Sequence, residues 1–216
     1  MECWYKNNCK QYHEGCACLR YDEMVALFQQ SNIPEGRWGK ISMTTDVDIS
    51  QFRRLAEIKR NIKNWVEGGN NLYLYSRNFG NGKTSWAIKL MQSYFNSVWP
   101  GNRFRRRGVF FSVPEFIDRE HIRMNGDDEE FDELREALVT CDLVVWDDVS
   151  AVKLTDYSHS VLLNFIDTRL VNNKCNIFTG NLDGERLGQF AGGRLASRIW
   201  NESEIIQFNG PDRRGQ

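Results

Sequence analysis

Short apolar runs alternate with longer stretches of helical periodicity from residue 72 onward, and this alternation constrains the fold more than any other feature. The expected strands are Leu72–Ser76, Arg107–Val113, Leu143–Asp147, Asn176–Thr179 and Ile205–Phe208. The helical patterns between them span residues 83–98, 114–139 and 156–171, and each is long enough to connect two parallel strands. The sequence therefore predicts an α/β fold with a five-stranded parallel sheet flanked by helices, in which ligands bind at the carboxyl ends of the strands.

The region before the first strand contains two further helical patterns. Apolar residues recur at helical spacing in "RYDEMVALFQQSNIP", and a second helix is expected from about Ile49 to the glycine pair at 68–69. The stretch "EGRWGKISMTTD" between them is expected to be a loop or linker. These patterns divide the chain into an N-terminal region of residues 1–35, a linker of residues 36–48 and a main domain of residues 49–216.

The composition is that of a soluble globular protein. The 216 residues are 41% hydrophobic and 26% charged, and the net charge of −1 provides no overall attraction to nucleic acid or to a membrane. Binding to nucleic acid would therefore require a local basic patch. Neither an apolar run of membrane-spanning length nor a signal-peptide pattern is found, so we expect a cytoplasmic protein.

The stretch "SRNFGNGKTS" resembles a phosphate-binding loop whose first glycine is replaced by Arg77. It lies between an expected strand and an expected helix, as phosphate binding requires. Gly80 and Gly82 allow the backbone N–H groups to turn inward, and the helix N-terminus adds positive partial charge. Lys83 would reach the β- and γ-phosphates of a nucleotide, and the hydroxyl of Thr84 would bind Mg²⁺. Arg77 either adds a charge near the phosphates or points to solvent.

The stretch "CDLVVWDDVS" reads as a buried parallel strand that ends in two carboxylates. Asp147 would hold Mg²⁺ through water, and Asp148 would position or activate an attacking water. The alternative is a helix N-cap. Because the loop and the carboxylates occur in the right order and Asp147 follows Lys83 by about 64 residues, the two motifs together predict nucleotide binding.

Two later segments contain candidate catalytic residues. "NIFTGN" ends an expected strand with Thr179 and Asn181, and Asn181 would hydrogen-bond the γ-phosphate or its attacking water; the alternative is a turn residue before "LDGERL". In "GGRLASRIW", Arg194 and Arg198 share one helical face. They are either a solvated stripe or a pair that stabilises the charge of the transition state, often across a subunit interface.

The cysteines are unevenly distributed. Cys3, Cys9, Cys16 and Cys18 crowd the first 18 residues, which in a reducing compartment favours a zinc site over disulfides. The one-residue gap between the last two is tight for two ligands of one ion, so His13 is an alternative ligand; surface thiols are the other interpretation. The isolated Cys141 and Cys175 are expected to be small core residues.

The residues themselves indicate DNA binding only in a few short segments. The densest basic run, "RFRRRG", includes Arg105 and either contacts phosphates or is the solvated entry to the second strand. Tyr157 offers a ring on which a base could stack, or packs against a neighbouring helix. The acidic run "GDDEEFDE" would repel DNA and is expected to face solvent or a protein partner.

Nearly everything from residue 31 to the end resembles the AAA+ ATPases of the DnaC/DnaI helicase-loader family, which includes the IstB-like ATP-binding proteins. The stretches that carry the resemblance are "SNIPEGRW", "YLYSRNFGNGKT", "FFSVPEFI", "DLVVWDDVS", "LLNFIDTRLVNNKCNIFTGNL", "GRLASRI" and "IIQFNGPDRRG". The resemblance implies an AAA+ P-loop NTPase core preceded by a small cysteine-rich, zinc-binding domain that docks on the helicase. The chain is shorter than typical cellular loaders, chiefly in this first domain, which fits a phage-encoded loader in the cytoplasm of a bacterial host.

The resemblance also assigns roles to individual residues. Arg198 matches the arginine finger with Arg194 as its companion, Asn181 matches sensor 1, and Asp148 is the second Walker B acid. The residues implied to bind ATP or ADP are Gly80, Asn81, Gly82, Lys83, Thr84, Ser85, Asp147 and Arg214, the last a sensor 2 type arginine, and Mg²⁺ would lie at Thr84 and Asp147. Thr155 and Tyr157 match positions implicated in contacts with single-stranded DNA.

The function that follows is ATP-dependent loading of a replicative hexameric helicase onto single-stranded DNA during replication initiation. ATP would let the chains associate through the ATP site, and hydrolysis, expected to be slow and stimulated by partners, would loosen the assembly. Arg77 and the shorter second Walker B acid depart from the usual pattern of the family. The alternatives are an IstB-type transposition ATPase and a helicase-binding inhibitor that does not hydrolyse ATP.

Overall fold

The computed structural model describes residues 3–14, 16, 18–39, 41, 43, 45–100, 105–124, 126 and 128–212. Within these ranges one sheet contains the strands β1 (Leu72–Tyr75), β2 (Gly108–Ser112), β3 (Leu143–Asp147), β4 (Cys175–Gly180) and β5 (Glu204–Gln207). The strands lie in the order β2-β3-β4-β1-β5, and each neighbouring pair is parallel. The predicted α/β fold with a five-stranded parallel sheet is confirmed.

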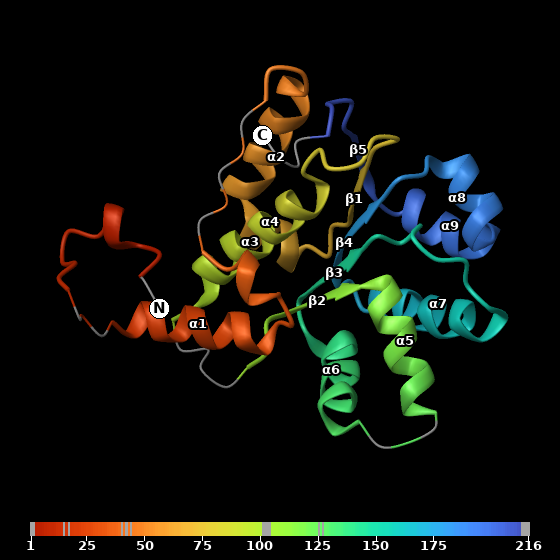
Figure 1. Cartoon of the computed structure of the whole chain (residues 1–216), viewed down its shortest axis with the longest axis horizontal. Coiled ribbons are helices and arrows are strands. Elements are labelled where there is room, and N and C mark those ends of the chain that lie inside the picture. The colour runs from red at the N-terminus through yellow and green to blue at the C-terminus, as the bar shows by residue number, and fades with distance from the viewer. Residues whose placement is uncertain are drawn as a thin grey trace.

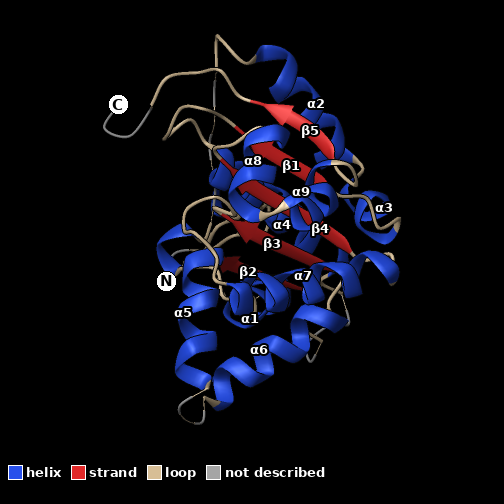
Figure 2. Cartoon of the chain, turned by 90° about the vertical axis from the view of Figure 1, so that its right-hand side faces the viewer, coloured by secondary structure: helices blue, strands red, loops and turns tan. Residues whose placement is uncertain are grey.

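Helices cover both faces of the sheet, which gives the molecule three layers (Figures 1 and 2). One layer contains α1 (Leu19–Gln30), α2 (Ile49–Arg60), α3 (Ile62–Glu67) and α4 (Lys83–Val98). The other contains α5 (Val113–Arg123), α6 (Glu129–Thr140), α7 (Asp156–Val171), α8 (Gly184–Ala191) and α9 (Gly193–Trp200). Alternate residues of β1 point into the two cores: Leu74 packs with the first layer and Tyr73 with the second.

Three helices differ from the sequence prediction. The expected helix at 114–139 is two helices, because the segment between α5 and α6 contains Gly126 and because Asp128 caps α6, accepting a hydrogen bond from the Phe131 N–H at 3.1 Å. The expected helix from Ile49 to the glycine pair breaks at Asn61, which leaves helical geometry with φ −111°. No helix was expected at α8, which begins within "LDGERL" and is capped by Asp183.

Aromatic packing attaches the N-terminal segment to the rest of the chain. The ring of Phe28 in α1 lies 5.7 Å from that of Phe95 in α4, and Trp4 packs edge-on against Phe28 and Tyr21. The segment after α1 contains a short 3-10 helix, η2 (Glu35–Arg37), and another, η1 (Lys6–Asn8), precedes α1. The domain limits given above stay predictions. In the described ranges, every helix is too short or too polar to cross a bilayer.

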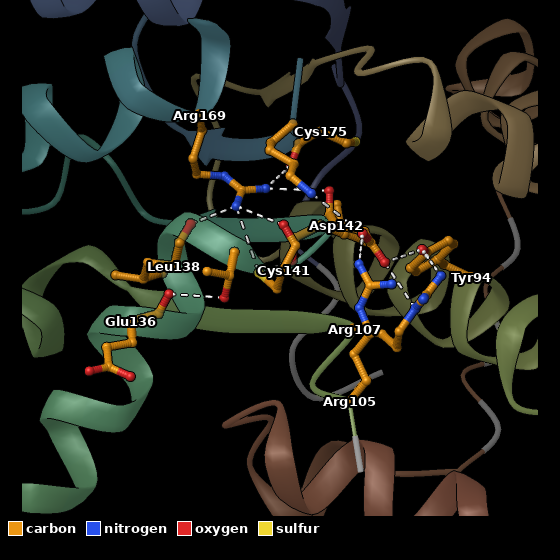
Figure 3. A network of polar contacts seen from close by, with 12 residues as sticks. Tyr94, Arg105, Arg107, Glu136, Leu138, Cys141, Asp142, Arg169 and Cys175 are labelled. Carbon is orange, nitrogen blue, oxygen red and sulfur yellow. Dashed lines mark hydrogen bonds and ion pairs between the residues drawn. The ribbon is translucent and has the colours of Figure 1, made fainter. Parts of the chain in front are cut away.

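A buried arginine ties together the amino ends of β3 and β4 (Figure 3). The side chain of Arg169 is fully buried and donates to the carbonyl oxygens of Leu138 and Cys175, each at 2.6 Å, and to Asn176 Oδ1 at 2.7 Å. Cys141 and Cys175 lie buried beside it, as expected of small core residues. Burial raises the pKa of both thiols, to about 12 for Cys175, so both stay protonated.

We predict that Arg169→Met lowers the free energy of unfolding by about 3 kcal/mol or more, because several buried carbonyl oxygens lose their donor. Urea unfolding measures the loss. The matched control is Arg60→Met at the exposed end of α2, which should change stability by less than about 0.5 kcal/mol. Equal stability of the two variants would contradict the role assigned to Arg169.

Candidate nucleotide-binding site

Polar residues from three strands meet at the carboxyl edge of the sheet. β1 leads into the loop of residues 76–82, and β3 ends at Asp147. From β4, the Thr179 hydroxyl donates to Asp147 Oδ1 at 2.6 Å and accepts from the Asp148 N–H at 3.0 Å. Thr179, which the sequence indicated only as part of a polar pair, therefore holds the carboxylate of Asp147 and the backbone of Asp148.

The loop has the backbone that phosphate binding requires. Gly80 and Gly82 have φ values of 65° and 99°, a region that residues with a side chain rarely adopt, and α4 begins directly after Gly82. Lys83 is buried and its Nζ lies back over the loop, 3.1 Å from Asn78 O and 3.4 Å from Asn81 Oδ1. A cation and the N-terminus of a 16-residue helix thus face the same space.

The missing first glycine has a structural explanation. Arg77 does not have a positive φ, so this position does not require glycine. Its exposed side chain donates to Asp183 Oδ2 at 3.2 Å, which joins the loop to the cap of α8. Arg77 therefore makes an exposed ion pair with a neighbouring element.

A cavity of about 580 Å³ opens in front of the loop. It is lined by Arg37, Phe79, Gly80, Asn81, Gly82, Lys83, Thr84, Ser85, Asp148, Ser150, Ala151, Asn181 and Leu182. Asn181, as predicted from its place after β4, faces this cavity; its backbone N–H bonds Ser150 Oγ at 2.9 Å. Its side-chain Oδ1 is buried without a hydrogen-bond partner among the described residues, so this acceptor has unused bonding capacity.

Arg37 is a cavity residue that the sequence analysis missed. Its Nη1 lies 3.4 Å from Ser85 Oγ in the first turn of α4, and its charge acts on Asp147. It comes from η2, before the main domain, and no motif spacing connects it with the loop. The available signal was its place in "SNIPEGRW", one of the stretches that carried the family resemblance.

The electrostatics of Asp147 fit a cation site. The pKa of this carboxyl is raised to about 6, chiefly by burial and also by the nearby charge of Asp148, while hydrogen bonds from Thr179 and Thr84 act in the opposite direction. A buried carboxylate beside a threonine hydroxyl provides the oxygen ligands that Mg²⁺ prefers. The residues present therefore fit a magnesium ion bound with a nucleotide.

Asp148 has a strained backbone. Its φ of 56° lies in the left-handed region, which costs a residue with a side chain about 1 kcal/mol or more. The hydrogen bond from its N–H to Thr179 holds this conformation, and Asp148 lines the cavity. Strain of this kind is common where a side chain must be aimed at a ligand.

The two candidate finger arginines lie outside the residues that line the cavity. Arg198 Nε binds Asp167 Oδ1 at 2.6 Å, and Arg194 binds Asp167 Oδ2 at 3.1 Å. Both side chains are partly exposed, and Asp167 belongs to α7. Arg214 lies outside the described residues.

The three candidate DNA residues are not gathered in one place. Thr155 caps α7, accepting from the Ser158 N–H at 3.2 Å, and Tyr157 in the first turn is 40% exposed. Both follow the carboxyl end of β3. Arg105 precedes the amino end of β2 and binds Asp142 at 2.9 Å, at the opposite edge of the sheet (Figure 3).

The predicted zinc site is not supported. Within residues 3–14, 16 and 18–39, and elsewhere in the described chain, no three His, Cys, Asp or Glu side chains gather closely enough to hold a metal. Cys3, Cys9, Cys16, Cys18 and His13 therefore form no ligand set. Packing of Trp4 against α1 attaches this segment instead.

Comparison with solved structures identifies the same fold in replication proteins. The DnaC helicase loader matches with a TM-score of 0.66 and 19% identity, over 82% of this chain and 100% of that one. DnaI matches with a TM-score of 0.62 and 19% identity, over 86% and 99%. The replication initiator DnaA, solved with AMPPCP and single-stranded DNA, matches with 0.57 and 19%, over 78% and 48%. No family model and no curated sequence matches the chain. The chain therefore has the AAA+ fold of the DnaC and DnaI structures.

The raised pKa of Asp147 predicts a pH-dependent stability in protein free of magnesium and nucleotide. The folded chain holds this proton more tightly than the unfolded chain, whose carboxyl has a pKa of 3.8. The stabilisation is therefore complete below pH 3.8 and is lost as the pH rises through about 6. At pH 8 the ionised carboxylate should lower the free energy of unfolding by about 2 to 3 kcal/mol.

Asp147→Asn removes this charge and keeps an acceptor for Thr179. Its free energy of unfolding relative to wild type should rise by about 2 to 3 kcal/mol between pH 4 and pH 8, measured by urea unfolding in EDTA. The matched control is Asp46→Asn at an exposed position before α2, measured in the same way. A pH-independent difference for Asp147→Asn would contradict the prediction.

Proposed function

We propose that this chain is an ATPase that loads a replicative hexameric DNA helicase onto single-stranded DNA during replication initiation. The observation that carries the proposal is the joint placement of a glycine loop, Lys83 and Thr84 around one cavity of about 580 Å³, with the buried Asp147 carboxylate hydrogen-bonded to Thr84. Further support comes from the fold shared with a DnaC helicase loader.

The loop residues bind the triphosphate. Backbone N–H groups from Gly80 to Ser85 surround the phosphates, and Lys83 leaves Asn78 and Asn81 to contact the β- and γ-phosphates. Thr84 and Asp147 would hold Mg²⁺, which would neutralise charge on the phosphate oxygens. Deprotonation of Asp147, whose pKa is about 6 without a cation, accompanies that binding.

Hydrolysis requires a water in line with the γ-phosphorus. Asp148 orients this water and accepts its proton, while the free amide oxygen of Asn181 accepts a hydrogen bond from it. The new P–O bond forms as the bond to the β–γ bridging oxygen breaks, which releases ADP and inorganic phosphate.

Self-association completes the site. Arg198, with Arg194 beside it, contacts the γ-phosphate bound to the next chain, so ATP favours assembly and ADP loosens it. Each arginine must first leave Asp167. The two ion pairs are solvent-exposed, so breaking them costs about 1 kcal/mol each or less. Arg214 is proposed to contact the nucleotide as a sensor 2 arginine.

The remaining contacts are with macromolecules. Residues 1–35 are proposed to dock on the helicase. Thr155 and Tyr157 are proposed to contact single-stranded DNA, with the exposed ring of Tyr157 stacking on a base. Arg105 contributes at most a separate phosphate contact, because it lies at the other edge of the sheet.

The test is ATP turnover with and without single-stranded DNA and a hexameric helicase. Partners should stimulate wild-type turnover. Arg198→Ala should lower stimulated turnover about 1,000-fold and leave ATP affinity within about twofold, because the finger acts on the transition state in a neighbouring chain. Lys83→Ala should lose ATP binding itself.

Two results would contradict parts of this proposal. If the wild-type protein binds ATP but does not hydrolyse it with any partner, the function as a helicase-binding inhibitor is favoured. Stimulation by a transposase and duplex DNA in place of helicase and single-stranded DNA would favour the IstB-type function.

A second prediction concerns Arg37. Arg37→Met should weaken binding of both ATP and ADP about fivefold, since its guanidinium faces the first turn of α4 beside the phosphate site. Equilibrium titration with a fluorescent nucleotide measures this change, and Arg60→Met serves as the control. Unchanged affinity would mean that Arg37 only lines the cavity.

A further inference from the structure

We infer that Asp48 is a positioning residue for the phosphate-binding loop and acts through the segment of residues 208–212, here called the tail. The inference rests on the proposed function, because it concerns the same nucleotide site. Asp48 comes directly before α2, and the loop lies about 30 residues further along the chain.

Asp48 is a buried carboxylate with an unusual pair of partners. Its side chain is only 1% exposed, accepting hydrogen bonds from the backbone N–H groups of Asn209 at 2.8 Å and Gly210 at 3.0 Å. It makes no capping bond to its own helix. A buried charge is costly without such partners, so the carboxylate and the tail fix each other's position.

The other side of the tail contacts the loop. Asn78 Nδ2 donates to the carbonyl oxygens of Asn209 at 3.3 Å and Gly210 at 3.2 Å, and Asn81 Nδ2 lies 3.5 Å from Gly210 O. Asp212 lies against the loop glycine, since a Cβ on Gly80 would be 1.6 Å from Asp212 Oδ1.

One peptide group connects the two sets of contacts. The carbonyl of Asn209 and the N–H of Gly210 belong to the same planar trans peptide, in which these groups point in opposite directions. When the N–H is held by Asp48, the carbonyl must face Asn78. The orientation set by the carboxylate is therefore transmitted through this rigid peptide to the side chain of Asn78 in the loop.

The contacts continue to the lysine that would bind phosphate. Asn78 O and Asn81 Oδ1 both accept from Lys83 Nζ. The tail lies close to the loop because β5 pairs with β1, and the Phe208 N–H bonds Tyr75 O at 2.8 Å just before the two segments diverge. A polar path thus runs from Asp48 through the tail to Lys83.

The experiment compares Asp48→Asn with Asp46→Asn, an exposed acid two residues away. Asparagine has the same shape as aspartate. The substitution replaces one carboxylate oxygen, which accepts a hydrogen bond, by an NH₂ group that faces a backbone N–H donor. We expect Asp48→Asn to weaken Mg-ATP binding about tenfold and to speed hydrogen exchange of the loop amides at residues 76–83 in nucleotide-free protein. Asp46→Asn should change neither measurement.

Asn78→Ala cuts the same path at an exposed residue and carries little risk of unfolding. It should reproduce both effects, and the double variant should lose less affinity than the two single losses added together. The inference would be overturned if both Asp48→Asn and Asn78→Ala bound Mg-ATP with wild-type affinity and exchanged their loop amides at the wild-type rate. This holds whatever the melting temperatures of the two variants.

The two hypotheses can fail separately. Loop exchange is measured without nucleotide, so it tests the Asp48 path even if the ATPase proposal is wrong. If wild type fails to bind Mg-ATP, the proposed function fails. If wild type binds it and neither variant differs in affinity or exchange, only the role of Asp48 fails.

Discussion

Parallel pairing of β1, β3 and β4 is the constraint on which the rest of the site depends. It places the ends of three strands that are far apart in sequence at one edge, where the Thr179 hydroxyl lies 2.6 Å from Asp147 and 3.0 Å from the Asp148 N–H. At the opposite edge, buried Arg169 bonds carbonyl groups around the starts of β3 and β4. The strand register that aligns the carboxyl ends is thus fixed by a polar network at the amino ends, and the site stands on rigid elements rather than on loops alone.

The segment before α2 contributes to the candidate nucleotide site, although the sequence suggests a linker there. Arg37 faces Ser85, and Asp48 holds the tail against the loop. Met43 lies over the second loop glycine, since a Cβ on Gly82 would be 2.2 Å from Met43 Cε. The loop is therefore supported by chain on either side of the core domain, and its conformation depends on contacts made by residues before the first strand and after the last.

The arrangement of charges suits a switch. Lys83 and the arginines that would act on the phosphates have partners within the chain: Asn78 and Asn81 for the lysine, Asp167 for Arg194 and Arg198. Exposed ion pairs such as those of Asp167 contribute little to stability, so a triphosphate with several negative charges can replace them. These contacts can change when a nucleotide and a neighbouring chain bind, which is how nucleotide state can set partner affinity.

The sequence by itself determined the order of strands and helices, the glycine loop and the paired acids, because apolar periodicity and motif spacing are local properties. It failed where the decisive interaction was between distant segments. The cysteine cluster predicted zinc, yet folding does not bring those side chains together. The break between α5 and α6 is a local exception, because Asp128 caps a new helix three residues from Phe131 within a continuous helical pattern. Arg37 and Asp48 carry no motif, and only the tertiary structure places them at the loop, because β5 pairing with β1 and the packing of the N-terminal segment bring the tail and the segment before α2 to the same edge of the sheet.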